Sequence, residues 1–231
     1  MDLSALKGNT KLEELSFSST TIKDLAPIGT CTNLEKVKIY MCYIESKTIS
    51  PLKALTDLEE LTLDNINTLT NFGELGNLTN LEELVVKDIR DHNTPENAID
   101  TSIFANMPKL EKVSFEKVEI NNLSKTGPEL EEISLINVNK NNDKAFDITT
   151  IVAPQAEKLE IKEMKITNAE SIAKNFPKLE TLTLQKCEGV TNYDFLKELP
   201  DKTRVTLSKD AITEDFKKEL QETKKIYVNM W

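Results

Sequence analysis

Apolar and polar residues alternate along this chain in a unit that repeats every 20 to 29 residues. Each unit contains a tetrad: a leucine, a glutamate, a third residue that is usually charged, and a second aliphatic residue. Six clear copies precede two looser ones, and the eight tetrads begin at Leu12, Leu34, Leu58, Leu81, Leu110, Leu130, Ala156 and Leu179. A repeat of this length predicts a solenoid, in which each coil packs only against its neighbours.

The pattern inside each unit predicts one short strand and one return segment per coil. Counting the first tetrad residue as position 1, positions 1, 4 and 6 are apolar in nearly every copy, and this period of two is typical of a strand with one buried face. Later apolar residues recur every three residues, which favours a helical or 3₁₀ return segment. In the third copy they are Leu69, Phe72, Leu75 and Leu78. Residues 168–176 of the seventh copy predict a short α-helix that ends before Pro177.

Together the units predict an α/β fold, a right-handed solenoid of about eight to nine coils with a parallel β-sheet along its concave face. We expect residues 1–231 to form a single domain. Its predicted parts are a partial first coil (1–11), eight repeats (12–201), and a degenerate last repeat with a C-terminal cap (202–231).

Both ends depart from the regular unit. Residues 2–11 match only the second half of a repeat, so we expect a chain cut from a longer one, with Leu3 and Leu6 exposed. Near the other end, residues 213–225 predict an amphipathic helix that begins after an N-cap at Thr213. The residues expected to complete the last strand and close the stack are Val205, Leu207, Ile226, Val228 and Trp231.

These repeats resemble those of the leucine-rich repeat family. Residues 24–34, which begin Asp24-Leu25-Ala26-Pro27-Ile28, and residues 72–81 are similar to the repeats of bacterial internalin-type surface proteins in particular. The resemblance implies a module that binds another protein, on a protein that is secreted or held at the cell surface.

One position departs from the family pattern. The family places Asn or Cys at position 9, where the side chain satisfies backbone groups in the turn after each strand. Only Cys42 and Cys187 fit here, and the other copies carry Thr20, Ile66, Ile89, Val118, Val138 and Met164. An unpaired buried amide costs about 1 to 3 kcal/mol. We therefore expect apolar core at this position and turns that are more irregular than those of the family.

Composition and charge restrict the partners. The chain has 29 basic and 39 acidic residues, a net charge of −10, and no basic run that could follow a phosphate backbone, so we expect no nucleic-acid partner. No apolar run approaches the roughly 20 residues that span a bilayer, so we expect no membrane insertion by this segment. Three widely spaced cysteines suit neither a disulfide framework nor a zinc site, and we expect small buried residues instead.

Catalysis has little support in the sequence. The chain has one histidine, His92, with no nucleophile motif beside it, and no metalloprotease, lipase-type, P-loop or dinucleotide-binding motif occurs. We therefore expect a protein that is not an enzyme, with no cofactor, no metal and no catalytic residues.

Residues at positions 3, 5 and 7 of each strand should point away from the core. Charges at position 3 mostly alternate and cancel, except where Glu60 faces Glu83, with Asp64 nearby and Lys87 as the only close cation. The neighbouring carboxylates are Glu59, Glu82 and Asp88. Three interpretations stay open for this acidic group: a solvated face, a docking patch for a basic partner, and a calcium site.

Apolar side chains at outward positions suggest a contact surface, because a face that meets only water has little reason to carry them. The candidates are Tyr40, Met41, Val85 and Ile136. Two longer segments after the strands, residues 90–97 and 139–145, should emerge along the same edge, where insertions in solenoids often belong to the binding face.

The sequence leaves three functions open. The first is a non-enzymatic protein-binding module of a bacterial secreted or cell-surface protein. The second is an intracellular regulatory or scaffolding subunit, which the same repeats could form. The third is a substrate-adaptor segment of a larger enzyme. Neither the identity of the partner nor the oligomeric state follows from the sequence.

Overall fold

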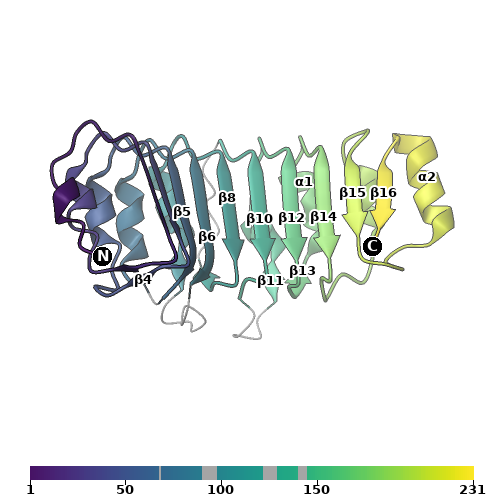
Figure 1. The fold of residues 1–231 in the computed structure, drawn as a ribbon. Coiled ribbons are helices and arrows are strands. Elements are labelled where there is room, and N and C mark those ends of the chain that lie inside the picture. Colours follow the sequence, from purple (N-terminus) through teal and green to yellow (C-terminus); the bar gives the residue numbers. More distant parts are fainter. Residues whose placement is uncertain (68, 90–97, 122–128, 140–144) are drawn as a thin grey trace.

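The computed structural model describes residues 1–67, 69–89, 98–121, 129–139 and 145–231. Within them, ten parallel strands form one sheet in which each strand pairs with that of the next coil (Figure 1). The strands are β1 (Glu14–Ser18), β3 (Lys36–Tyr40), β5 (Glu60–Ile66), β6 (Glu83–Ile89), β8 (Lys112–Glu116), β10 (Glu132–Ile136), β12 (Lys158–Lys162), β14 (Thr181–Gln185), β15 (Arg204–Leu207) and β16 (Tyr227–Met230). The predicted solenoid is confirmed.

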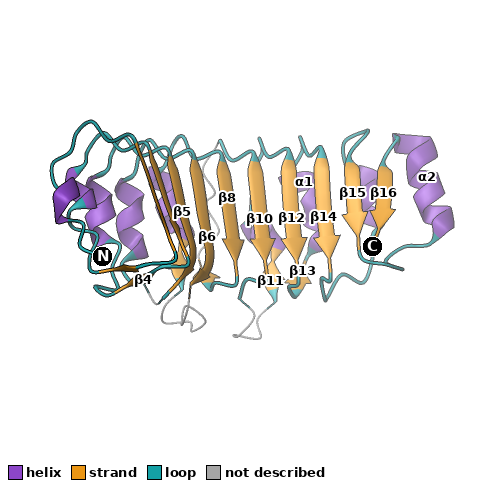
Figure 2. Cartoon of the chain, viewed as in Figure 1, coloured by secondary structure: helices purple, strands orange, loops and turns teal. Residues whose placement is uncertain are grey.

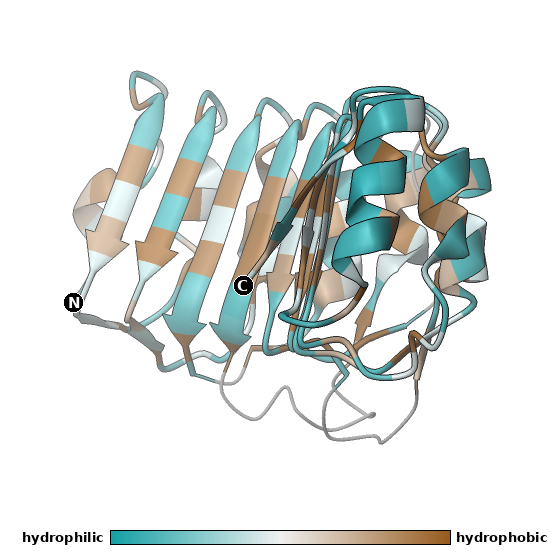
Figure 3. Cartoon of the chain, turned by 90° about the vertical axis from the view of Figure 1, so that its right-hand side faces the viewer, coloured by the Kyte–Doolittle hydropathy of each residue, from teal (hydrophilic) through white to brown (hydrophobic). Residues whose placement is uncertain are grey.

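The register of the sheet matches the repeat. The strands of the eight tetrad copies begin at position 3, so that Glu14 pairs with Lys36 and Lys36 with Glu60. Positions 4 and 6 turn inward, where Ile39 and Leu63 are fully buried, and Figure 3 shows the resulting alternation of hydropathy along the strands. We call the opposite side, formed by positions 3, 5 and 7, the open face.

Short helices return the chain behind the sheet, on the side away from the open face (Figure 2). The 3₁₀ turns are η1 (Ser4–Leu6), η2 (Ile28–Thr30), η3 (Ser50–Ala54), η4 (Phe72–Asn77), η6 (Thr101–Asn106), η8 (Ile148–Thr150), η9 (Ala169–Ser171) and η10 (Asp194–Glu198). Three pairs of two-residue strands join neighbouring coils: β2 (Thr21–Ile22) with β4 (Tyr43–Ile44), β7 (Ile99–Asp100) with β9 (Ile120–Asn121), and β11 (Phe146–Asp147) with β13 (Ile166–Thr167). The three-residue spacing therefore predicted the return segments correctly.

The helix predicted at residues 168–176 is shorter than expected. The 3₁₀ turn η9 leads into a single α-helical turn, α1 (Ile172–Asn175). Asn168 adopts the left-handed conformation, with φ 57°, and its side chain donates a hydrogen bond of 2.8 Å to Asp147 in the preceding coil. A helix cannot begin at a residue held in that conformation.

The turn after each strand is regular, so the expectation of irregular turns was wrong. Position 8 adopts the left-handed conformation in all eight copies, at Ser19, Met41, Asn65, Asp88, Lys117, Asn137, Glu163 and Lys186. The N–H of Met41 donates to the carbonyl of Asp64 in the next coil (2.9 Å), and that of Asn137 donates to Lys162 (2.8 Å). The sheet ladder thus continues through the turn and satisfies amides that the family satisfies with a side chain.

Two asparagines provide caps at position 10, one residue later than the family's asparagine. The side chain of Asn67 accepts from the N–H of Ile44 (2.6 Å) and donates to its carbonyl (2.9 Å). Asn139 makes the same pair of bonds to Ile120, at 2.7 and 3.1 Å. Each asparagine therefore satisfies backbone groups of the preceding coil.

Position 9 faces the core as expected. Ile66, Ile89, Val118 and Val138 are almost completely buried there. All three cysteines are free: Cys31 and Cys42 are buried, and burial raises the pKa of the half-buried Cys187 thiol to about 11. The interpretation of the cysteines as structural residues agrees with this placement.

The C-terminal cap contains the predicted helix and one strand more than predicted. Helix α2 (Glu214–Lys224) begins after Thr213, whose hydroxyl accepts from the N–H of Phe216 (3.2 Å). The additional strand, β16, pairs with β15 and buries Val228, whereas Trp231 is 80% exposed. The prediction that Trp231 closes the stack was wrong, because it follows Tyr227 by four residues and so lies on the outward parity of the strand.

The first coil is also better closed than expected. Leu3 is only 4% exposed and Leu6 is half-buried, so the prediction that both are exposed was wrong for Leu3. The 3₁₀ turn η1 folds Leu3 onto the core, and the N–H of Leu6 donates to the carbonyl of Leu3 (2.9 Å).

Candidate functional site

Seven of the eight candidate residues lie on the open face, over four strands. They are Tyr40 on β3, Glu60 and Asp64 on β5, Glu83, Val85 and Lys87 on β6, and Ile136 on β10. Met41 lies elsewhere, in the left-handed turn after β3, where it is 57% exposed. A strand extended by one residue would have carried Met41 to the core side, and the turn at position 8 instead directs the chain out of the sheet.

Glu60 is not an uncompensated carboxylate. Lys36 and Lys38 of β3 approach it from the neighbouring coil, with Nζ to carboxylate distances of 2.8 and 3.2 Å. The hydrogen bond from Lys36 is the largest influence and holds the pKa of Glu60 below its usual value, although burial opposes it. The expectation that Lys87 is the only cation near this acidic group was therefore wrong.

The negative charge of the acidic group is also partly compensated at Asp88, on β6. Asp88 lies 3.8 Å from Lys117, which also approaches Glu116 at 3.8 Å. In the part of the chain that the structure describes, no group of three or more histidine, cysteine or acidic residues is arranged to hold a metal ion. The carboxylates on β5 and β6 therefore form a dispersed charge rather than a ligand cluster.

Ion pairs continue along the open face toward the C-terminus. Glu132 is shared by Lys112 (3.5 Å) and Lys158 (3.2 Å), on the strands to either side. Glu160 contacts Lys162 (2.6 Å) and accepts a hydrogen bond from the Ser134 hydroxyl (2.7 Å). Burial works against ionisation of Glu160, but these two partners outweigh it and hold its pKa below the usual value.

A hollow of about 210 Å³ lies on the open face over β6, β8, β10 and β12. It brings together four of the candidate residues: Glu83, Val85, Lys87 and Ile136. Its floor contains two small side chains at position 5, Ser114 and Ser134, which pair with each other in register. The sequence analysis missed these serines, although two small residues at one outward position of adjacent copies are a visible signal.

Charges around this hollow balance in number. Its lining contains three lysines, Lys87, Lys112 and Lys158, and three glutamates, Glu83, Glu132 and Glu160. Among the described residues, neither Glu83 nor Lys87 forms an ion pair. Within the described part of the chain, β6 therefore presents Glu83 at position 3 and Lys87 at position 7 without an ion pair, with the apolar Val85 between them at position 5. The charge of Glu83 is one of the smaller influences that raise the pKa of Lys38 on β3.

A row of glutamates lies at position 2, just before the strands. Its members are Glu13, Glu35, Glu59, Glu82, Glu111, Glu131, Glu157 and Glu180. Their backbones form a continuous ladder, as where the N–H of Glu35 donates to the carbonyl of Glu13 (2.8 Å). With described residues, their side chains form no ion pair. Much of the net negative charge therefore lies along one margin of the sheet.

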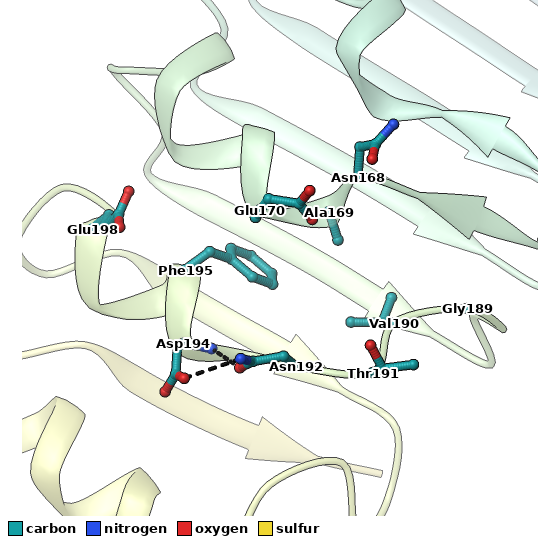
Figure 4. A pocket seen from close by; sticks show the side chains of 10 residues that line it. All are labelled: Asn168, Ala169, Glu170, Gly189, Val190, Thr191, Asn192, Asp194, Phe195 and Glu198. Atoms are coloured by element: carbon teal, nitrogen blue, oxygen red, sulfur yellow. Dashed lines mark hydrogen bonds between the residues drawn. The ribbon is translucent and has the colours of Figure 1, made fainter.

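A second hollow, of about 320 Å³, lies between the return segments of the seventh and eighth copies (Figure 4). The buried ring of Phe195 and the carboxylates of Glu170, Asp194 and Glu198 line it. Asn192 donates to Asp194 (3.0 Å) and accepts from its backbone N–H (2.7 Å), which shapes one wall. None of the candidate residues lies there.

Two sequence predictions concern parts of the chain outside the described residues. Residues 90–97, with His92, and residues 140–144 belong to the two long segments that follow β6 and β10. The prediction that these segments share one edge therefore stays a prediction.

The parallel sheet, the 3₁₀ returns and the one-strand-per-coil register define a leucine-rich repeat solenoid. A solved structure of similar fold is internalin C2 of Listeria monocytogenes, with a TM-score of 0.52 and 20% identity over 86% of this chain and 72% of that one. A second is the internalin InlF of the same organism, with a TM-score of 0.45 and 15% identity over 95% and 83%. No family model and no curated protein sequence matches the chain.

The likeness to internalin C2, at 20% identity, establishes the internalin-like fold and nothing more specific. Over the described residues, no helix has both the length and the apolar character needed to cross a membrane.

Proposed function

We propose that this chain is a non-enzymatic protein-binding module of a bacterial secreted or cell-surface protein. Its recognition surface is the open, concave face from β3 to β10 together with the adjacent edge. The observation that carries the proposal is a set of half-buried apolar side chains on a face that is otherwise polar or charged: Val85 and Ile136 line the hollow, and Tyr40 lies on β3, to one side of it.

The chemistry of this face suits protein recognition. Partly exposed apolar groups bordered by charged ones resemble the centre and rim of protein interfaces, where tyrosine is frequent among the residues that dominate affinity. Most charges here already have partners, so a binding partner does not need to neutralise a strong field. The fold shared with internalin C2 supports the same class of function.

A variant of the open face tests this proposal. The triple variant Tyr40→Ala, Val85→Lys, Ile136→Lys should lose the partner that wild type retains in a pull-down followed by mass spectrometry. A matched control changes exposed residues elsewhere, Tyr227→Ala and Val152→Lys, which are 54% and 53% exposed. Binding of the recovered partner should then weaken at least tenfold in calorimetry, because loss of an anchor residue costs about 2 kcal/mol or more. Equal recovery of the partner by wild type, the triple variant and the control variant would contradict the proposal that the open face binds it.

A second function has one observation in its favour. The three cysteines are free, which suits a reducing compartment and hence an intracellular regulatory or scaffolding subunit, or the adaptor segment of an enzyme. Labelling of intact cells with a membrane-impermeant reagent distinguishes the two locations. Labelled native protein supports the surface role, and protection until lysis supports the intracellular one.

A further inference from the structure

We infer that the hollow over Ser114 and Ser134 receives one apolar side chain of an extended partner segment, and that this side chain is flanked by a cation and an anion that pair with Glu83 and Lys87. The inference deepens the proposed function and rests on it. It names the chemistry of the partner at the centre of the open face.

Size and shape point to a single side chain. Cavities that bind small molecules usually have volumes of about 300 to 1,000 Å³, and this one has about 210 Å³. Along position 5, Val85 pairs with Ser114, Ser114 with Ser134, and Ser134 with Glu160. The two serines therefore leave a gap between two longer side chains, Val85 and Glu160. Val85 forms an apolar wall of this gap, and Ile136 lines the gap at position 7.

Charge complementarity selects what surrounds the apolar side chain. The pairs formed by Glu132 and Glu160 occupy the charges on β8, β10 and β12, and this leaves Glu83 and Lys87 on β6 without an ion pair among the described residues. A partner gains by offering a cation to Glu83 and an anion to Lys87, and the anion gains less because Asp64 and Glu116 flank Lys87 in register. A partner of one charge sign would meet attraction at one end and repulsion at the other.

Spacing indicates that the partner segment is extended. Positions 3, 5 and 7 of a strand follow each other at about 6.6 Å, twice the rise per residue. An extended segment repeats its own same-face side chains at this interval. Residues i and i+4 of a partner segment aligned with β6 can therefore meet Glu83 and Lys87. The side chain of residue i+2 then lies over Val85 and extends sideways into the hollow toward Ser114, on the adjacent strand about 4.8 Å away.

A defined peptide tests the inference without knowledge of the natural partner. The probe is acetyl-Arg-Ser-Leu-Ser-Asp-amide, titrated into the full, isotope-labelled chain and followed by amide chemical shifts. Saturable shifts should appear at residues of β6, β8 and β10 that line the hollow. The same peptide with serine in place of leucine should produce much smaller shifts.

Two protein variants sharpen the test. Ser114→Phe fills the hollow and should abolish the saturable shifts, whereas Ser16→Phe, at the same position of β1, should leave them unchanged. Lys87→Glu should reverse the preference between the original peptide and one that carries arginine at both ends, by about two- to fivefold for an exposed ion pair. Unchanged spectra away from the hollow show that each variant is folded.

The outcomes separate this inference from the broader function. Absence of localised shifts at the highest soluble peptide concentration, or equal shifts with the serine peptide, would overturn the inference. If the triple variant of the open face still loses its natural partner in that case, the proposed function stands and only the anchoring chemistry is wrong.

Discussion

Single residues decide how the charges of the open face behave. In the sequence, Glu60 stands among six carboxylates, but in the structure two lysines of the preceding coil reach it. A glutamate whose pKa is lowered by folding stabilises the folded state above its ordinary pKa of 4.5. That contribution is lost as the pH falls through the lowered pKa.

Replacement of Glu60 by glutamine should therefore have an effect that depends on pH. At neutral pH the variant should unfold at lower denaturant concentration, by less than about 1 kcal/mol because the ion pairs are partly exposed. The difference should vanish when both proteins are compared at a pH where Glu60 is protonated. Urea unfolding at several pH values measures it. Glu180→Gln, which removes an exposed carboxylate without an ion pair among the described residues, is the control, and an equal loss for both variants would contradict the argument.

At the scale of the element, the turn after each strand holds the coils together. Its left-handed residue at position 8 keeps the backbone ladder intact, so that no side chain is required at position 9. Two coils add an asparagine at position 10, and Asn67 and Asn139 each bridge two backbone groups of the coil before. These side chains are caps between elements rather than binding residues.

The substitution Asn67→Ala should destabilise the protein by about 1 to 3 kcal/mol, because it leaves the buried N–H and carbonyl of Ile44 without that partner. Thermal or denaturant unfolding followed by circular dichroism measures the loss. Asn77→Ala is a matched control, since the Asn77 side chain donates one exposed hydrogen bond among the described residues, to the Glu74 carbonyl (2.8 Å). Equal stability of both variants would contradict the conclusion that Asn67 stabilises the fold by capping the backbone of Ile44.

At the scale of the whole molecule, each coil contacts mainly the coils beside it. The strand contacts run from β1 to β16 in chain order, and α2 packs on β16 and on η10. The free energy of unfolding of such a solenoid is approximately the sum of the intrinsic stability of each coil and the interaction energy between neighbouring coils. Damage at one end should therefore stay local.

Leu220→Ala tests that expectation in the C-terminal cap. Leu220 is fully buried in α2, and truncation of such a residue costs about 2 to 5 kcal/mol. Hydrogen exchange should accelerate in α2, β15 and β16 and stay unchanged in β3 and β5. A uniform acceleration across the sheet would show instead that the chain unfolds as one cooperative unit.

The sequence by itself determined the architecture. Leucines at positions 1, 4 and 6 cannot be buried within one coil, and their recurrence leaves stacking as the physical solution. The same period of two placed seven of the eight candidate residues on the open face correctly, because a strand directs alternate side chains to opposite sides. Met41 was also expected at an outward strand position, and it lies instead in the turn after β3. It also assigned Val205 and Leu207 to a ninth strand correctly.

Only the tertiary structure decided how residues from different coils meet. The pairing of Glu60 with two lysines depends on the direction and reach of side chains across neighbouring coils. The burial of Leu3 depends on the turn η1, and the exposure of Trp231 depends on the strand β16, which was not predicted. The hollow depends on two serines, each unremarkable within its own repeat, that adjacent strands bring side by side. A repeat predicts what each coil contains, whereas the contacts between coils are set by the register, the turn conformation and the lengths of the side chains that face each other.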